Sequence, residues 1–196
     1  MNHTLIEVAF YGRGGQGAVT AANLFAKSGY MTGNFPYIMA FPVFGPERRG
    51  APVSAYARIS RHEIFDRAKI YNPDILVILD VSILKIANPT GTLKKDGIML
   101  VNTSDDAGTL RKKYGISSDV KLGIVDIVKI CFDIKLLIGN SVPILNTPIL
   151  GAIARVLPDV SLDTIDAAIK DYFSNEKIAA LNIEGARRAH DNLVIC

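Results

Sequence analysis

The stretch LIEVAFYGRGGQGAVTAANL, residues 5–24, joins an apolar segment to a helix-favouring segment through four glycines. Residues 5–11 are mostly apolar and predict a buried strand, and a helix is expected from about Gln16 to Tyr30. Gly12, Gly14 and Gly17 fit the pattern G-x-G-x-x-G, which lets backbone N–H groups and a helix N-terminus approach an anion. A tight turn with close helix–strand contact explains the same glycines equally well.

The rest of the chain alternates between further strand and helix patterns. Strands are expected at 53–60, 75–80, 97–102 and 122–126, and helices at 144–156, 162–173 and 178–189. The segment 34–52 contains four prolines and is predicted to be a long ordered loop. Short strands that end in Asp or Asn, separated by crossover-length segments, indicate an α/β fold: a three-layer αβα domain spanning 1–196, with a mostly parallel, doubly wound sheet and a helical C-terminal third.

Composition narrows the classes of partner. The chain has 196 residues, 49% of them hydrophobic, and a formal net charge of +3 from 22 basic and 19 acidic residues scattered along it. No clustered basic stripe favours nucleic acid, and the apolar run at 5–11 is too short to cross a membrane. Only two cysteines occur, Cys131 and Cys196, which favours a reducing compartment, so a cytoplasmic location is expected.

The glycine pattern lacks the acidic residue that dinucleotide sites need. No Asp or Glu lies between Glu7 and Glu47, so nothing is placed to hold the ribose hydroxyls of NAD. Lys27 is the only basic residue between Arg13 and Arg48, which gives little support for a 2′-phosphate. NAD(P) binding is therefore disfavoured.

A second group of candidate residues lies in FGPERRGAP, residues 44–52. Glu47, Arg48, Arg49 and Gly50 stand between proline-restricted flanks, and adjacent arginines can grip a carboxylate or a phosphate. An exposed pair, or one that forms a salt bridge with Glu47 or with a partner subunit, is the alternative. The chain has no C-x-x-C motif, no nucleophile elbow and no P-loop lysine, and its histidines are isolated, so neither a metal site nor a catalytic residue is expected in it.

Several motifs together resemble one known family. They are GRGGQG at 12–17, FGPERRGAPV at 44–53 before a strand that ends in Arg58-Ile59-Ser60, Pro73-Asp74 before a hydrophobic strand, Val125-Asp126, and NTPILG at 146–151. In this order the sequence resembles the gamma subunit of 2-oxoacid:ferredoxin oxidoreductases over nearly its whole length. The sequence ERRGAPV, residues 47–53, is most similar to that of the pyruvate synthase type.

The resemblance implies a division of labour within an enzyme complex. A 2-oxoacid, pyruvate before 2-oxoglutarate or a branched-chain or aryl 2-oxoacid, would be oxidatively decarboxylated on thiamine diphosphate, with electrons passing through iron–sulfur clusters to ferredoxin and the acyl group to coenzyme A. The alpha, beta and ferredoxin-like delta subunits would hold the thiamine diphosphate and the clusters, so the gamma chain alone would be inactive and would bind no cofactor tightly.

The candidate residues for coenzyme A or for a subunit interface are Gly12, Gly14, Gly15, Gln16, Gly17, Glu47, Arg48, Arg49 and Gly50. A free-standing dinucleotide-binding or regulatory module is the alternative of another class.

Overall fold

The computed structural model describes residues 3–43, 50–86 and 89–196. Its main sheet contains β1 Leu5–Arg13, β2 Tyr37–Val43, β3 Pro52–Ser60, β4 Ile75–Ile78, β5 Ile98–Asn102, β6 Lys121–Val125 and β9 Val194–Ile195. The helices are α1 Ala18–Met31, α2 Ile83–Ile86, the short 3₁₀ helix η1 Pro89–Thr92, α3 Ala107–Tyr114, α4 Ile127–Asp133, α5 Pro148–Val156, α6 Leu162–Tyr172 and α7 Glu176–Asp191. A small hairpin joins β7 Leu137–Ile138 to β8 Val142–Pro143.

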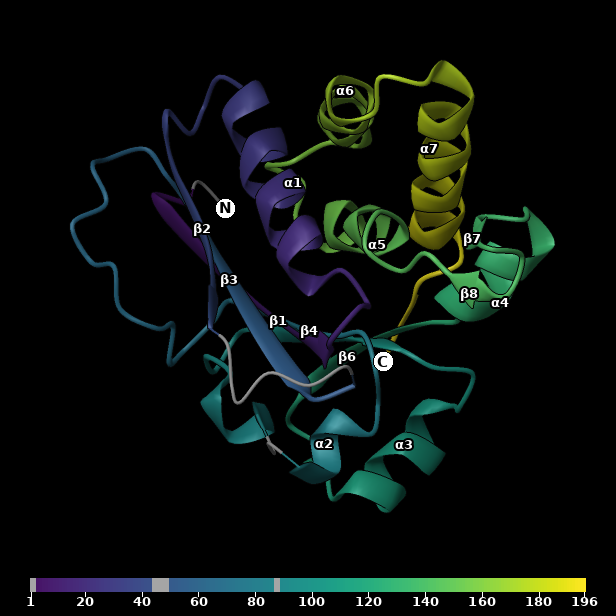
Figure 1. Cartoon of the computed structure of the whole chain (residues 1–196). Coiled ribbons are helices and arrows are strands. Elements are labelled where there is room, and N and C mark those ends of the chain that lie inside the picture. Colours follow the sequence, from purple (N-terminus) through teal and green to yellow (C-terminus); the bar gives the residue numbers. More distant parts are fainter. Residues whose placement is uncertain (1–2, 44–49, 87–88) are drawn as a thin grey trace.

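The strand order in the main sheet is β2-β3-β1-β4-β5-β6-β9. The four strands β1, β4, β5 and β6 are parallel, whereas β3, β2 and β9 pair antiparallel to their neighbours. Helices α1, α5, α6 and α7 lie on one side of the sheet, and α2 and α3 lie on the other (Figure 1). The expected three-layer, doubly wound α/β fold with a helical C-terminal third is therefore confirmed.

Each face of the sheet packs against its own hydrophobic cluster. Phe10 and Val77 belong to the cluster under α1 and α5, while Leu76 and Met99 belong to the cluster under α2 and α3. Every residue of β4 and β5 is buried, as the unbroken apolar runs predict for central parallel strands. No helix in the described part of the chain is both long and apolar enough to cross a membrane.

The segment 34–52 corrects the sequence prediction, because a long loop was expected and the structure has strand β2 there. Pro42 lies in this strand opposite Ala55 of β3. Proline is tolerated because β2 is an edge strand of the sheet. On its outer side no strand accepts backbone hydrogen bonds, so an absent N–H there breaks none. Proline counts alone therefore underestimate strand formation at a sheet edge.

Helix α5 begins later than the sequence predicts, at Pro148 rather than Ile144. Val142 and Pro143 form strand β8, and the Ile144 amide donates a hydrogen bond to the Leu136 carbonyl. Pro148 then suits the first helical turn because that turn needs no N–H from it. This late start leaves Asn146 and Thr147 at the helix N-terminus, where they face other elements.

Candidate functional site

The glycine loop lies at the point where the direction of winding of the sheet reverses. The chain leaves β1 through α1 on one face, whereas it leaves the adjacent parallel strand β4 through α2 on the other face (Figure 1). In open α/β sheets, ligands bind outside the carboxyl ends of the strands at this position. The topology thus places the predicted glycine motif where a binding crevice is expected.

Positive φ angles give the loop its shape. Gly15 has φ +96° and Gly17 has φ +81°, both in the region that side chains disfavour. A Cβ on Gly15 would meet no atom within 4 Å, but a Cβ on Gly17 would lie 2.8 Å from the side chain of Asn146. Both positions therefore require glycine for their backbone conformation. Gly17 also has to lack a side chain because Asn146, just before α5, packs against it.

Short hydrogen bonds close the loop and tie it to β3. The Arg13 amide donates to Gln16 Oε1 at 2.7 Å, and the Gln16 amide donates back to the Arg13 carbonyl at 3.0 Å. The Gly14 amide donates to the Ala51 carbonyl at 2.9 Å. Gln16 thus fixes the turn with its side chain, a role that its place among the glycines did not specify.

Four side chains gather at the carboxyl ends of β1 and β4, and we call them the switch-point cluster: Arg13, Gln16, Asp80 and Ser82. Arg13 donates from Nη2 to Ser82 Oγ at 2.7 Å and lies 3.3 Å from Asp80 Oδ2. Gln16 Nε2 donates to the same carboxylate oxygen at 3.0 Å. Arg13 Nη1 also donates to the Gly50 carbonyl at 2.8 Å, so the cluster links the glycine loop to the segment before β3.

The charge of Asp80 is stabilised by this cluster. Partial burial on its own would raise the pKa of Asp80, but hydrogen bonds from Ser82 and Gln16, together with the positive charge of Arg13, outweigh burial and lower that pKa below its usual value. Asp80 therefore remains a carboxylate, and it neutralises the one arginine of the glycine motif. The hydrogen-bonding groups of the cluster therefore satisfy one another at the strand ends.

Asn102 connects the next two strand ends to this cluster. Its Nδ2 donates to the Leu79 carbonyl at 2.9 Å, and its Oδ1 accepts from the Ile127 amide at 2.9 Å. The residue is buried, so both bonds are shielded from water. One side chain thus aligns the carboxyl ends of β4 and β5 with the start of α4.

The N-terminus of α1 keeps unused hydrogen-bonding capacity. Its N-cap is Gly17, which supplies no side-chain cap, and its first turn has no acidic residue. Within the described residues, the buried Oδ1 of Asn146 has no hydrogen-bond partner. Helix N–H donors and a buried amide acceptor therefore adjoin one another, which suits a ligand that carries both anionic and donor groups.

The structure brings together most of the predicted site residues. The glycine loop holds Gly12, Gly14, Gly15, Gln16 and Gly17, and the Gly50 carbonyl accepts a hydrogen bond from Arg13 of that loop. Glu47, Arg48 and Arg49 lie outside the described residues. Sequence reasoning did not select Asp80, Ser82 or Asn146, although the strand ending in Asp and the NTPILG motif were both visible signals.

The topology explains the missing ribose acid. In dinucleotide-binding folds that acid lies about 20 residues beyond the glycine motif. Here the neighbour of β1 on that side is β3, which runs antiparallel and so brings its amino end, at Pro52 and Val53, beside the glycine loop. On this side of β1 the backbone therefore differs from that of a dinucleotide-binding fold.

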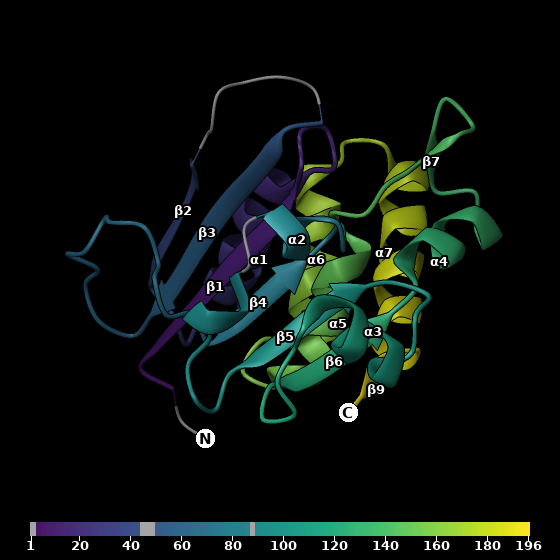
Figure 2. The same cartoon turned by 90° about the horizontal axis from the view of Figure 1, so that it is seen from below.

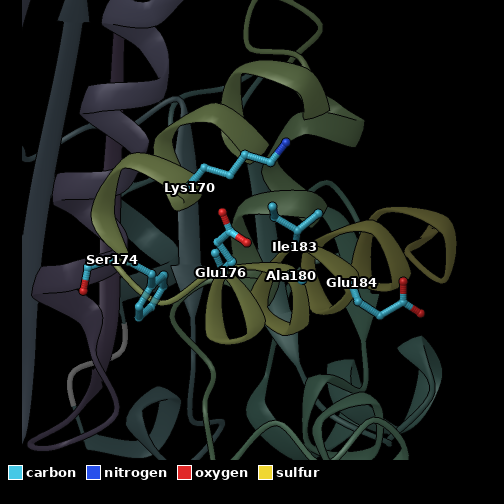
Figure 3. A pocket seen from close by; sticks show the side chains of 8 residues that line it. Lys170, Ser174, Glu176, Ala180, Ile183 and Glu184 are labelled. Atoms are coloured by element: carbon cyan, nitrogen blue, oxygen red, sulfur yellow. The ribbon is translucent and has the colours of Figure 1, made fainter.

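A second hollow lies between the end of α6 and α7, with a volume of about 750 Å³. Figure 3 shows Lys170 on one side and Glu176, Ile183 and Glu184 along α7 on the other. Two carboxylates at the rim would repel an anion. The α1 N-terminus, which has no side-chain cap and no acidic residue in its first turn, is therefore the better candidate for an anionic ligand.

Comparisons with known proteins agree on one family. Residues 7–192 match the model of the family described as pyruvate ferredoxin/flavodoxin oxidoreductase. The pyruvate/ketoisovalerate oxidoreductases common subunit gamma of Pyrococcus furiosus is 44% identical, over 95% of this chain and 96% of the relative. The pyruvate synthase subunit PorC of Methanothermobacter marburgensis is 42% identical, over 96% of this chain and 98% of the relative.

A solved structure extends the similarity to the fold. The crystal structure of the pyruvate oxidoreductase subunit PORC from Thermotoga maritima matches with a TM-score of 0.82 and 34% identity. The match covers 98% of this chain and 99% of that one. The helices and strands described above are thus those of a known subunit type.

Proposed function

Because the chain belongs to the pyruvate ferredoxin/flavodoxin oxidoreductase family, we propose that it completes the coenzyme A-dependent half of a pyruvate-oxidising complex. The chain is a gamma subunit of a pyruvate or 2-oxoacid:ferredoxin oxidoreductase, an oxidoreductase built from several subunits. The observation that carries the proposal is the α1 N-terminus without a side-chain cap, beside the unpaired Oδ1 of Asn146.

Partner subunits supply the redox chemistry in this proposal. A four-thiolate iron–sulfur cluster needs more cysteines than the two in this chain, and Cys131 is buried with its Sγ donating to the Ile144 carbonyl. Burial raises the pKa of Cys131 to about 12, which removes it as a thiolate ligand. Alpha, beta and delta subunits would therefore hold the thiamine diphosphate and the clusters, and ferredoxin would reach this chain only through them.

The chain's own residues fit coenzyme A as the acyl acceptor. Its phosphates are anions, which the first N–H groups of α1 can bind, and the open space at Gly15 allows close approach to the backbone. Asn146 Oδ1 is buried without a partner, so its side chain would have to turn toward the α1 N-terminus to accept a hydrogen bond from a hydroxyl or amide of the same molecule. Coenzyme A supplies the thiol that takes the acyl group, and this chain binds and orients it. Arg48 and Arg49 remain predicted contacts to its phosphates or to a partner subunit.

Pyruvate is the proposed substrate, with a branched-chain 2-oxoacid second. The Pyrococcus relative is named as common to pyruvate and ketoisovalerate oxidoreductases. A subunit shared in that way cannot itself select the 2-oxoacid. The polar side chains of the switch-point cluster bond to one another, so they are not available to bind a 2-oxoacid, and in this proposal the partner subunits select it.

The test is a pair of matched glycine substitutions in the reconstituted complex. Gly15 and Gly115 both have positive φ, and a Cβ at either would meet no atom within 4 Å, so Gly15→Val and Gly115→Val impose the same kind of backbone strain. Only Gly15 adjoins the α1 N-terminus. We expect Gly15→Val to raise the KM for coenzyme A in pyruvate-dependent viologen reduction, or to prevent co-purification if the loop forms a subunit contact. Gly115→Val should do neither.

Two results would overturn the proposal. The first is a Gly15→Val complex that assembles and uses coenzyme A like the parent. The second is pyruvate-dependent viologen reduction by the isolated chain, because partner subunits would then be unnecessary.

A further inference from the structure

Strand β2 presents an unusually apolar edge. Its sequence, YIMAFPV, contains no charged residue, and β2 is the outermost strand on its side of the sheet. Ile38 is 41% exposed although it lies in a regular strand. Exposed edges are usually protected by charge or by covering segments, because they readily pair with another chain.

A groove runs along this edge. It has a volume of about 420 Å³ and lies between β2, the last turn of α1 and the loop after β3. Figure 2 shows that loop projecting beside the outer edge of β2. The side chains that define the groove are Tyr30, Tyr37, Ile38, Glu63, Ile64 and Arg67.

A buried arginine holds the loop in place. Arg58 donates from Nη1 to the carbonyls of Asp66 at 3.0 Å and Ala68 at 2.9 Å, while its Nε donates to Glu7 Oε1 at 2.9 Å. Phe65 belongs to this anchored loop, yet it is 82% exposed. An aromatic side chain held in solvent by a fixed backbone loses little entropy on binding, which is the property of a preformed contact surface.

Two prolines limit how a second strand can pair with this edge. Pro42 has no N–H. Proline is tolerated in a strand where the nitrogen faces away from the paired strand, so the nitrogen of Pro42 is on the outer side, away from β3. The backbone alternates, so the N–H groups of Ile38 and Ala40 point the same way, and Pro36 lacks the next one. The edge therefore offers two donors flanked by prolines, enough for a short pairing and too few for open-ended growth.

We propose that this edge is the two-fold interface between two copies of this chain. A two-fold axis needs a surface that complements itself. The groove carries one acid, Glu63, and one base, Arg67, and within residues 3–43, 50–86 and 89–196 neither makes an ion pair. Each can therefore pair with its opposite number on the second copy.

The exposed aromatic side chains supply a little under half of the area that a stable dimer needs. Tyr30, Tyr37 and Phe65 are 57%, 43% and 82% exposed. At the area that an aromatic side chain offers, these fractions amount to roughly 350 Å². The aliphatic side chains and the backbone of β2 extend this toward the roughly 800 Å² per partner of a stable interface.

The proposal fixes a register. Antiparallel pairing satisfies the two donors of each strand reciprocally when Ile38 of one copy lies opposite Ala40 of the other. Met39 then faces the same residue of the second copy in a pair without mutual hydrogen bonds, with Cα atoms about 4.5 Å apart. This separation lies within the range that a disulfide spans.

Sedimentation velocity of the full chain at tens of micromolar tests the interface. We expect the parent to sediment as a dimer and Ile38→Asp as a monomer, because the substitution would place two carboxylates in the apolar contact. Ile138→Asp is the control, since Ile138 is 60% exposed on the β7–β8 hairpin, away from β2, and this variant should remain a dimer. A monomeric parent, or an Ile38→Asp variant that remains dimeric, would overturn the proposal.

Cross-linking tests the register in the assembled complex. Met39→Cys, in a background with Cys196→Ser, should form a disulfide-linked species of twice the 21.2 kDa chain mass under mild oxidation. Tyr172→Cys, exposed at the end of α6, should not. A Met39→Cys variant that stays uncross-linked, or that links instead to a different subunit, would mean that another chain covers the edge. Neither readout depends on coenzyme A, so this test and that of the proposed function fail separately.

Discussion

Replacing Gly151 by alanine should lower the free energy of unfolding far more than a glycine-to-alanine substitution usually does in a helix. Gly151 lies in α5, and a Cβ built there would stand 1.7 Å from the Ala186 carbonyl oxygen of α7 and 2.5 Å from its carbon. Both atoms are backbone, so no rotamer change relieves the clash. Ordinary carbon contacts lie near 3.5 Å, so the two helices would have to separate by roughly 1.5–2 Å along their contact.

The expected magnitude is the difference of two effects. Alanine in place of glycine within a helix stabilises by about 1 kcal/mol. Overpacking costs about 1–3 kcal/mol and more where the backbone must shift, and separation of α5 from α7 also weakens buried contacts of Ile149 and Ala189. We expect a net loss of about 3 kcal/mol in the free energy of unfolding, which is a fall of about 6–12 °C in Tm for a chain of this size.

Urea unfolding followed by circular dichroism measures this loss. Gly108→Ala is the matched control: Gly108 also lies in a helix, α3, but its Cβ would meet only the end of the Asp106 side chain, at 3.2 Å. That variant should be as stable as the parent or up to about 1 kcal/mol more stable. If Gly151→Ala matched Gly108→Ala, the close approach of the two backbones would be refuted as the reason for glycine at 151.

Three further predictions follow from the buried and the charged groups. Asp80→Asn should lower stability at neutral pH. Its difference from the parent should begin to shrink as the pH falls below about 4, near the unfolded pKa of an aspartate, and should vanish only below the folded pKa, because the stabilisation from a carboxyl with a lowered folded pKa is lost between the two values. Urea midpoints across pH measure this. The exposed thiol of Cys196 should react rapidly with an aromatic disulfide reagent at pH 8. The thiol of Cys131 should react only after unfolding, because burial raises its pKa to about 12, and equal reaction rates for the two thiols would contradict this prediction. Asn102→Ala should cost about 2–4 kcal/mol in thermal or urea unfolding, because it leaves a buried carbonyl and a buried amide unpaired.

Local patterns were sufficient where local forces decide the structure. The strand and helix around the glycines, residues 5–31, and the buried runs of β4 and β5 follow from hydrophobic periodicity, and all are present. Strand β2 was missed because its stability comes from pairing with β3 and from its place at the edge, which no window of sequence contains. The start of α5 was misplaced for a similar reason, since the Leu136 carbonyl holds Ile144 outside the helix.

The candidate site divides along the same line. The glycines were predictable because positive φ restricts residue type at that position, as at Gly15 and Gly17. Their partners were not, because Asp80 and Asn146 reach the loop only after the sheet and α5 have packed. Residue types such as glycine indicate where the backbone can adopt positive φ. The residues that pack against such a position come from distant segments of the chain, which a local pattern does not identify.

The glycine loop shows why a motif must be interpreted together with its neighbours. The same G-x-G-x-x-G spacing that binds a dinucleotide elsewhere here adjoins an antiparallel strand, and its arginine is neutralised by Asp80. The usual position of the ribose acid is therefore occupied differently, while the α1 N-terminus has no side-chain cap. What remains is the part of the motif that depends only on backbone: a turn that brings helix N–H groups to the carboxyl end of β1. That part would serve the anionic ligand proposed above, because an anion needs N–H donors and does not need a ribose acid.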